Sequence, residues 1–406
     1  MNSCRFVENK YMKVTASIIL NKGRDEAVRR FHPWVFSGAI HKAVGKPEDG
    51  DIVDVIDSQG NYLATGHACT GSIAVKIFHF GSEKPKENFW TTKIEAALKL
   101  RQDISYAQNA ISNAYRLVFS EGDGLPGLVI DHYNGIAVMQ CHSTGMYLLR
   151  NEITAALRQV YGESLKAVYD KSTEALGKSG ARSEGDGFIY GNSGAAEILE
   201  NGHRFSIDFV DGQKTGFFLD QRDNRQLLGQ YAKGKNILNA FSYTGGFSVY
   251  ALAEGATHVT SLDSSRKAIE KLETNLALNE LDKSKHESIV DDAKAYLATM
   301  PENFDIIVLD PPAFAKRHAD RHKALQGYRF INAAAMKKIK PGGLLFTFSC
   351  SQAMNREMFI SMAMSAALEA GRNVRILHHM GHSADHPVSI FHPEGEYLKG
   401  LVLKVD

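Results

Sequence analysis

Polar and reactive residues follow a series of short apolar segments in the C-terminal half of this 406-residue chain. The segments span residues 237–240, 259–262, 288–290, 304–309 and 343–349. The residues at their ends are Asn239, Phe241, Tyr243 and Gly245 for the first, Asp263 for the second, Asp292 for the third, Asp310 for the fourth and Cys350 for the fifth. Carboxylates accept hydrogen bonds from ligands, and a thiol is a nucleophile. Together these groups indicate one chemical site.

The apolar segments alternate with helical patterns at 247–254, 265–279, 328–339 and 358–370. Strands that alternate with helices predict a parallel, doubly wound α/β sheet covered on both faces, with ligands at the carboxyl ends of its strands. Two final strands, at 373–378 and 398–405, have no helix-length segment between them, so we expect one of them to be antiparallel. Seven strands with this ending are the layout of a Rossmann-like class I methyltransferase.

The loop after the first strand favours a nucleoside over a dinucleotide. Gly245 and Gly246 precede a helix but lack the G-x-G-x-x-G spacing that binds a pyrophosphate. Asp263 ends the next strand, where an acid accepts ribose hydroxyls. S-adenosylmethionine is a ligand of this kind. Asp292 is placed to accept the adenine amino group; alternatively, it is the N-cap of a helix beginning at Ala293.

Asp310 begins the sequence Asp-Pro-Pro, in which two prolines stiffen the strand exit. Amino-methyltransferases place an aromatic residue next, but here Ala313 occupies that position, which argues against an exocyclic amine as the target. Cys350 suggests another reaction, because methylation of cytosine carbon-5 requires a thiolate to add to carbon-6 first. The alternative for Cys350 is a small buried apolar side chain.

The remaining cysteines, Cys4, Cys69 and Cys141, are far apart, which argues against disulfides or a zinc knuckle and favours a reducing, cytoplasmic compartment. Five histidines between His378 and His392 lack a zincin pattern, so we expect no metal. No apolar run approaches the ~20 residues of a membrane span, and the N-terminus does not resemble a signal peptide.

The N-terminal half predicts two smaller domains. Short strands separated by turns predict a β-rich domain over residues 1–85, in which 1–11 are an extension. A helix at 89–109 and four strand candidates predict an α+β domain over 86–200 that ends in a Gly-rich loop at 177–194, before the methyltransferase domain at 201–406.

Several motifs, taken in order, resemble the ribosomal RNA large subunit methyltransferase I family. They are Gly212–Arg222 (GQKTGFFLDQR), Phe241–Gly245 (FSYTG), Asp310–Pro312, Phe348–Ser351 (FSCS), Ala384–Pro387, Pro393–Gly395 and Tyr397–Gly400. His32–Gly38 (HPWVFSG) resembles the start of that family's N-terminal PUA domain, an RNA-binding module. The resemblance begins at Met12, which is therefore a candidate start of the protein.

The resemblance implies S-adenosylmethionine-dependent formation of 5-methylcytosine in 23S ribosomal RNA, with Cys350 as nucleophile and Asp310 in the base pocket. Lys and Arg total 47 against 46 for Asp and Glu, but eight Lys or Arg and one acid lie between Lys316 and Lys340. We expect RNA contacts at Lys316 and Arg317 on this segment, and at Arg29 and Arg30 in the PUA domain; the alternative is a solvated helix surface.

Two other functions are consistent with the sequence: methylation of another RNA atom, and RNA binding without catalysis. The region after Asp310 lacks the second cysteine that helps to release the product in many related enzymes. The sequence therefore does not identify the base that takes the carbon-5 proton. The sequence also does not identify the target nucleotide, and it does not distinguish free RNA from an assembling subunit as the substrate. The oligomeric state is not determined either, and a homodimer is one option.

Overall fold

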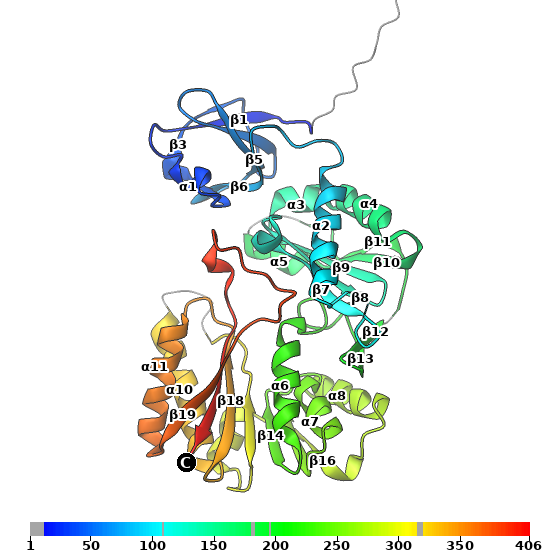
Figure 1. The fold of residues 1–406 in the computed structure, drawn as a ribbon, viewed down its shortest axis with the longest axis vertical. Coiled ribbons are helices and arrows are strands. Elements are labelled where there is room, and N and C mark those ends of the chain that lie inside the picture. The colour runs from blue at the N-terminus through cyan, green and yellow to red at the C-terminus, as the bar shows by residue number, and fades with distance from the viewer. Residues whose placement is uncertain (1–11, 108, 180–182, 195, 315–319) are drawn as a thin grey trace, which may run out of the picture. The chain divides into compact units, whose positions relative to one another are not determined.

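The computed structural model describes residues 12–107, 109–179, 183–194, 196–314 and 320–406. The chain forms two compact units (Figure 1). The first comprises Met1–Ala196, Ile207–Phe217 and Ala384–Gly395; the second comprises Glu197–Ser206, Phe218–Ser383 and Glu396–Asp406. The three-domain division expected from the sequence stays a prediction. None of the helices in the described ranges is long and apolar enough to cross a membrane.

The first unit begins with a six-stranded sheet in the order β2-β6-β5-β4-β1-β3. Its elements are β1 (Ala16–Leu20), α1 (Glu26–Arg29), β2 (Trp34–Phe36), β3 (Ile40–Val44), β4 (Ile52–Ile56), β5 (Tyr62–Ala68) and β6 (Ile73–Phe80). Residues of β1 alternate between buried and half-buried, so one face of the strand fills the core with side chains such as Ile18 and Leu20. The small β-rich domain expected from the sequence is confirmed.

A five-stranded sheet follows in the order β11-β10-β9-β8-β7. Its strands are β7 (Ala114–Phe119), β8 (Leu128–Tyr133), β9 (Ile136–Cys141), β10 (Ala167–Asp170) and β11 (Gly187–Gly191), and its helices are α2 (Phe89–Asp103), α3 (Thr144–Leu148), α4 (Arg150–Tyr161) and α5 (Thr173–Ser179). Two expectations were wrong here. The helix at 89–109 ends at Asp103, and the expected Gly-rich loop contains β11, which pairs with β10 at the sheet edge despite its terminal glycines.

The second unit contains a seven-stranded sheet in the order β16-β15-β14-β17-β18-β20-β19. The strands are β14 (Asn236–Ala240), β15 (His258–Asp263), β16 (His286–Val290), β17 (Ile306–Leu309), β18 (Gly343–Ser349), β19 (Val374–Met380) and β20 (Lys399–Val405). Neighbours from β16 to β18 are parallel, and β20 is antiparallel to both β18 and β19. This is the class I methyltransferase layout expected from the sequence, with the late antiparallel strand.

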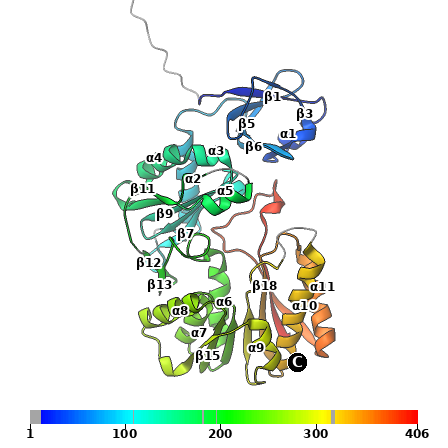
Figure 2. The same ribbon diagram turned by 180° about the vertical axis from the view of Figure 1, so that it is seen from behind.

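Helices cover both faces of this sheet (Figures 1 and 2). Side chains of α6 (Arg222–Ala232) and α7 (Gly246–Ala253) pack on one face, and side chains of α9 (Ala293–Thr299), α10 (Arg321–Lys338) and α11 (Arg356–Ala370) pack on the other. The remaining elements are α8 (Arg266–Leu278) and the hairpin β12 (Ala196–Glu200) and β13 (His203–Ile207). Because α10 begins with mostly exposed polar residues, its apolar pattern predicted only its second half, from 328.

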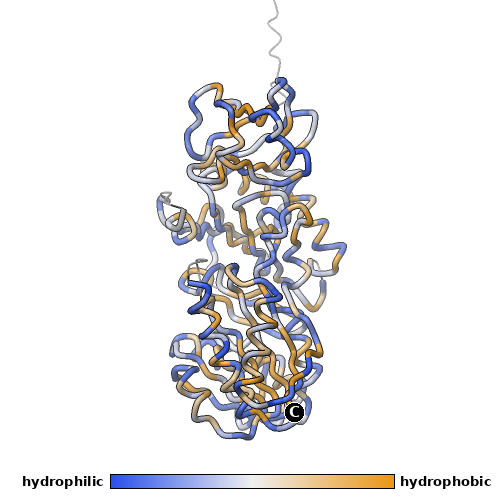
Figure 3. Tube along the Cα trace, turned by 90° about the vertical axis from the view of Figure 1, so that its left-hand side faces the viewer, coloured by the Kyte–Doolittle hydropathy of each residue, from blue (hydrophilic) through white to orange (hydrophobic). Residues whose placement is uncertain are grey.

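The hydropathy of the chain follows this layering. Hydrophobic stretches, orange in Figure 3, alternate along the chain with hydrophilic stretches, which are blue. In the seven-stranded sheet, β17 is buried along its whole length. A strand buried on both faces has no polar alternation, which explains the unbroken apolar run of its sequence. The sheet therefore gives a rigid base to the residues that follow its strands.

Candidate active site

Asp310 and Cys350 follow neighbouring parallel strands. Leu309 of β17 pairs with Thr347 of β18, Asp310 comes directly after β17, and Cys350 comes directly after β18. Tyr328 of α10, fully buried, links the two positions electrostatically. Burial raises the pKa of Tyr328 well above its ordinary value, and negative charge at Cys350 and at Asp310 raises it further. The carboxylate and the thiol expected from the sequence thus share one neighbourhood.

A chain of amides holds the Asp310 carboxylate. The Nε2 of Gln221 donates to Oδ2 of Asp310 at 2.9 Å, and the Nδ2 of Asn224 donates to Oε1 of Gln221 at 2.6 Å. Asn224 also donates to the carbonyl of Gly381 at 3.0 Å. Gln221 and Asn224 are both buried, so these bonds fix the carboxylate in one orientation. Gln221 lies in the motif Gly212–Arg222, but the sequence alone indicates no role for it.

Lys399 is a buried lysine whose amine lies near Cys350. It pairs in register with Ser349, and its Nζ donates to the carbonyls of Ser351 at 2.7 Å and Tyr397 at 2.6 Å. Its side chain is almost completely buried, and burial lowers its pKa to about 8 while negative charge at Cys350 acts in the opposite direction. Lys399 lies in the motif Tyr397–Gly400, but the sequence alone indicates no role for it, although a lysine two residues before the apolar run Leu401–Leu403 is a detectable signal.

The loop after β14 is strained where the cofactor was expected. Phe241 and Tyr243 have φ of 60° and 45°, values that non-glycine residues rarely adopt and that cluster at functional sites. The Asp263 carboxylate stabilises the loop, because its Oδ2 accepts from the Tyr243 N–H at 2.9 Å and its Oδ1 accepts from the Ser265 N–H at 2.9 Å. Gly245 has φ of 80°, and a Cβ there would lie 2.5 Å from Cγ of Leu272. Packing against Leu272 therefore requires a glycine at position 245.

Asn239 and Asp292 complete the expected cofactor residues. Asn239 is buried and donates to Oγ of Ser248 at 2.8 Å, while its Oδ1 has no hydrogen-bond partner among the described protein atoms. Asp292 accepts from the N–H of Ala295 at 3.0 Å as the N-cap of α9, so the capping interpretation is confirmed. Contact of Asp292 with an adenine stays a prediction.

These residues fit S-adenosylmethionine. The Asp263 carboxylate has lone pairs beyond the two it uses for the loop, which suits ribose hydroxyls. The free Oδ1 of buried Asn239 is an acceptor for a cationic or N–H-bearing ligand. The residues expected to hold the cofactor are Asn239, Phe241, Tyr243, Gly245, Asp263, Asp292 and Asp310, and their contacts with it stay predictions.

The expected RNA-binding residues differ in their surroundings. Arg29 lies within 2.5 Å of Asp25 and 2.8 Å of Asp57, and Arg30 lies 2.5 Å from Glu26, so both are exposed cations in ion pairs. Lys316 and Arg317 lie outside the described residues. Farther along the basic segment, Lys338 pairs with Glu302 at 3.1 Å. Contacts of these residues with RNA stay predictions.

The described residues contain no group of three or more His, Cys, Asp or Glu side chains that could hold a metal ion. His378 and His379 belong to β19, so the histidines do not all lie in one loop as expected. His386 instead bonds its neighbour, with Nδ1 2.8 Å from Oδ1 of Asp385.

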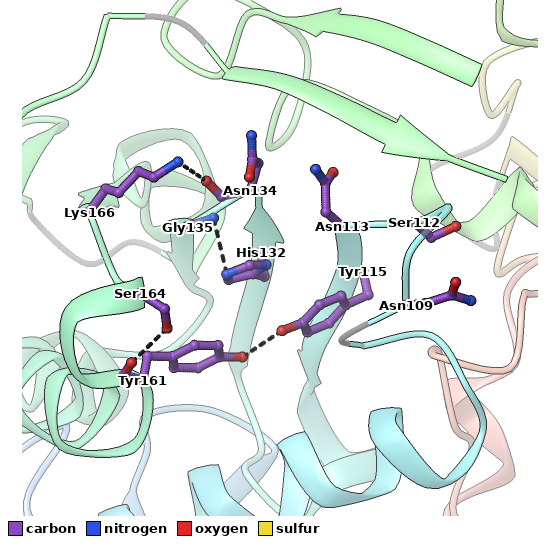
Figure 4. Close-up of a pocket in the computed structure, with 10 residues that line it drawn as sticks. All are labelled: Asn109, Ser112, Asn113, Tyr115, His132, Asn134, Gly135, Tyr161, Ser164 and Lys166. Carbon is purple, nitrogen blue, oxygen red and sulfur yellow. Dashed lines mark hydrogen bonds between the residues drawn. The ribbon is translucent and has the colours of Figure 1, made fainter. Parts of the chain in front are cut away.

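A separate pocket of about 350 Å³ lies in the five-stranded part of the first unit (Figure 4). The ring of His132 stacks between Tyr115 and Tyr161, with centroids 4.8 and 5.1 Å apart. Burial lowers the pKa of His132 to about 4, which leaves the imidazole neutral at pH 7. The lining residues are Asn109, Ser112, Asn113, Tyr115, His132, Asn134, Gly135, Tyr161, Ser164 and Lys166. Apart from the Lys166 ammonium, the pocket offers neutral hydrogen-bonding groups, and its lining contains no acid and no thiol.

Comparison with known proteins identifies the family. Residues 188–385 match a family model described as S-adenosylmethionine-dependent methyltransferase, and residues 18–80 match a PUA-like domain. Ribosomal RNA large subunit methyltransferase I from Tolumonas auensis is 41% identical over 399 residues, covering 96% of this chain and 100% of the relative. The chain belongs to the ribosomal RNA large subunit methyltransferase I family. The Escherichia coli SMS-3-5 relative of the same name is 38% identical, covering 97% of this chain and 100% of the relative.

Solved structures agree with this assignment at the level of the fold. A protein from Streptococcus mutans described as a SAM-dependent methyltransferase has a TM-score of 0.79 at 23% identity, covering 96% of this chain and 100% of that one. A methyltransferase complexed with SAH has a TM-score of 0.80 at 24% identity, with the same coverage. The PUA-like domain, the methyltransferase fold and S-adenosylmethionine as cofactor, all expected from the sequence, are confirmed.

Proposed function

We propose that this protein methylates carbon-5 of a cytosine in 23S ribosomal RNA, through a covalent bond between Cys350 and the base. The observation that carries the proposal is the position of Cys350 directly after β18, beside the Asp310 strand end and near the buried amine of Lys399. The names of the relatives support a ribosomal RNA substrate. Such a substrate would place the reaction in the cytoplasm.

The chemistry explains why a thiol is needed. S-adenosylmethionine supplies an electrophilic methyl group on a sulfonium. Carbon-5 of cytosine is a poor nucleophile, so the thiolate of Cys350 adds to carbon-6, and electron density rises at carbon-5. After methylation, carbon-5 loses its proton, the carbon-6–sulfur bond breaks and the thiolate is regenerated.

Asp310 and Lys399 have supporting roles in this proposal. The Asp310 carboxylate, oriented by Gln221, accepts a hydrogen bond from the cytosine edge and positions the ring. The Lys399 ammonium favours the thiolate of Cys350, because nearby positive charge lowers the pKa of a thiol. Cys350 is half-buried and forms no disulfide with another described cysteine, which suits an attacking group.

The residues after Asp310 support carbon over an exocyclic amine as the target. Ala313 occupies the position where amino-methyltransferases carry an aromatic ring. The ring of Phe314, one residue later, packs against Tyr328 with centroids 4.6 Å apart. Phe314 is thus half-buried and held against Tyr328, which does not favour it as the missing clamp.

Substitution of the thiol tests the proposal. Cys350→Ala should lower methyl transfer to 23S ribosomal RNA at least about 10³-fold, equivalent to roughly 4 kcal/mol in the barrier. Binding of S-adenosylmethionine, measured by calorimetry, should persist, and Cys69→Ala provides a matched control at another half-buried cysteine. Methylation by Cys350→Ala at a near wild-type rate would exclude the covalent route and favour methylation of another RNA atom.

A further inference from the structure

Large apolar side chains are exposed on the first unit, on two segments far apart in the sequence. Phe31 and Phe36 in the PUA-like domain are 52% and 47% exposed, and Ile390 and Phe391 near the C-terminus are 86% and 46% exposed. We call Phe31, Phe36 and Phe391 the aromatic surface, and Ile390 is the neighbour of Phe391 in the chain. Exposed apolar groups that gather in one region mark binding sites more often than singly scattered ones.

Contacts between rings join the two segments. The rings of Phe31 and Phe391 have centroids 5.4 Å apart, and the rings of the next residues, His32 and His392, lie 5.8 Å apart. His32 also contacts Phe36, with centroids 6.1 Å apart. Phe31 thus contacts Phe391, and Phe36 contacts the His32–His392 pair of the adjacent residues, so that packing within one unit holds the two segments together.

Phe31 occupies a position that costs backbone energy. It follows α1 in a Schellman motif, in which its N–H donates to the carbonyl of Val28 at 2.9 Å and the N–H of His32 donates to that of Ala27 at 2.9 Å. This motif requires a left-handed residue, usually glycine, and Phe31 has φ of 62°. A bulky aromatic residue here is strained and, at the same time, half exposed. Glycine would occupy this position without strain, so the half-exposed ring retained here motivates a functional hypothesis.

The charge around Phe31 complements a polyanion. Between residues 22 and 42 there are five Lys or Arg and two acids, and all five cations are exposed. They are Lys22, Arg24, Arg29, Arg30 and Lys42. Aromatic rings that stack on bases, among cations that contact phosphates, are the typical surface for single-stranded nucleic acid.

We propose that Phe31, Phe36 and Phe391 form a platform on which unpaired bases of the RNA substrate stack. The assignment rests on the proposed function, because it takes RNA as the substrate class, and it adds which structural form of RNA is bound and where. Phe31 is the central member, since it joins the two segments and carries the strain. A flat ring is required there, so an aliphatic side chain of similar size should not replace it.

Binding of a fluorescein-labelled, mixed-sequence 12-nucleotide RNA to the full-length protein tests the proposal by fluorescence anisotropy. Phe31→Leu should weaken binding of the single strand about 5-fold or more, whereas Phe31→Trp should retain it. The same oligonucleotide annealed to its complement should show little difference between the variants, because its bases are stacked on each other and cannot reach the rings.

Phe31→Gly gives a second arm, because glycine removes the ring and relieves the backbone. We expect its melting temperature to stay close to that of the wild type while its affinity for the single strand falls. Glu280 follows α8 in the same motif, with φ of 53° and N–H bonds from Glu280 and Leu281 to the carbonyls of Ala277 and Leu276. Glu280→Gly is thus a matched control that relieves the same strain and should leave RNA affinity unchanged.

The outcomes separate this assignment from the proposed function. Wild-type affinity for the single strand in both Phe31→Leu and Phe31→Gly would overturn the stacking platform and leave the methylation proposal intact. A wild-type protein that binds neither RNA would contradict the substrate class itself. If ultracentrifugation showed self-association that Phe31→Leu abolished, with unchanged RNA affinity, the surface would belong to a second copy of the chain and the assignment would be wrong.

Discussion

The side-chain amide of Gln221 donates to the carboxylate of Asp310 over 2.9 Å, joining the start of α6 to the end of β17. Asn224, one helical turn later, donates from its Nδ2 to Oε1 of Gln221 at 2.6 Å. The contact makes Gln221 a positioning residue, because it acts on the base only through Asp310. It also connects the motif Leu219–Arg222 to the strand that carries the carboxylate.

Gln221→Ala should lower kcat/KM for RNA methylation about 10-fold, since the Asp310 carboxylate loses a buried hydrogen bond that orients it. The double variant with Asp310→Ala should be no less active than Asp310→Ala alone, because both changes remove the same interaction. Steady-state kinetics of the four proteins provide the test. Additive losses would show that Gln221 acts independently of Asp310.

Asp263→Ala should weaken binding of S-adenosylmethionine by about 1–3 kcal/mol, because a buried ribose would lose a charged acceptor and the Tyr243 N–H its partner. Calorimetric titration measures the change. Asp282→Ala is a suitable control, because the Asp282 carboxylate accepts from the N–H two residues later just as Asp263 does, but lies away from the strand ends. Equal affinity in Asp263→Ala and wild type would remove Asp263 from the cofactor site.

Lys399 should make stability depend on pH above neutrality. Its pKa falls from 10.5 to about 8 on burial, so the unfolded chain binds more protons than the folded one between these values. The stability contribution of this group therefore rises as pH increases from about 8 to 10.5, by about 1–3 kcal/mol. Urea unfolding of wild type and Lys399→Met at several pH values should show that the difference in unfolding free energy shifts in favour of the wild type over this range. A pH-independent difference would show that the amine is not perturbed.

Lys399 should also affect the reactivity of Cys350. Loss of the ammonium in Lys399→Met removes the positive charge near the thiol, so the pKa of the Cys350 thiol should rise. Charged or titratable groups near these two residues are Asp310, Tyr328, Arg356 and Glu396, and all are kept in the variant. The pH profile of iodoacetamide alkylation at Cys350, followed by peptide mass, measures the shift. An unchanged profile would assign Lys399 a purely structural role.

Much of the methyltransferase fold could be predicted because its central strands are buried on both faces. Their apolar runs are short and clearly bounded, and β18 begins and ends at the residues expected for it, Gly343 and Ser349. The strand ends then indicated Asp263, Asp310 and Cys350 as a group, because parallel strands present their carboxyl ends on one edge.

The residues that the sequence did not reveal depend on contacts between distant segments. Lys399 reaches Ser351 only because β20 runs antiparallel to β18 in a particular register. Gln221 contacts a carboxylate 89 residues away. A short strand such as β11, which has a glycine at each end, has too little apolar pattern to be recognised without its partner β10.

Stability of the second unit should depend on Glu200, which is fully buried. Its carboxylate accepts from Arg225 at 2.7 and 2.8 Å and from the Tyr250 hydroxyl at 3.0 Å. Glu200→Gln should lower the free energy of unfolding by about 3–5 kcal/mol, because Arg225 stays buried without its counter-charge. Glu197→Gln, which breaks an exposed pair with Arg204, should cost less than about 1 kcal/mol. Similar losses in the two variants would contradict this account.

The covalent role of Cys350 can be measured directly with 23S ribosomal RNA fragments that contain 5-fluorocytosine. Fluorine at carbon-5 cannot leave as a proton does, so the enzyme should remain bonded to the methylated base after one turnover. Mass spectrometry of the digested complex, formed with S-adenosylmethionine, should find the nucleotide attached to the peptide that contains Cys350, and Cys350→Ala should form no adduct. An intact, unmodified Cys350 peptide, together with continued methylation of unsubstituted RNA, would contradict the covalent mechanism.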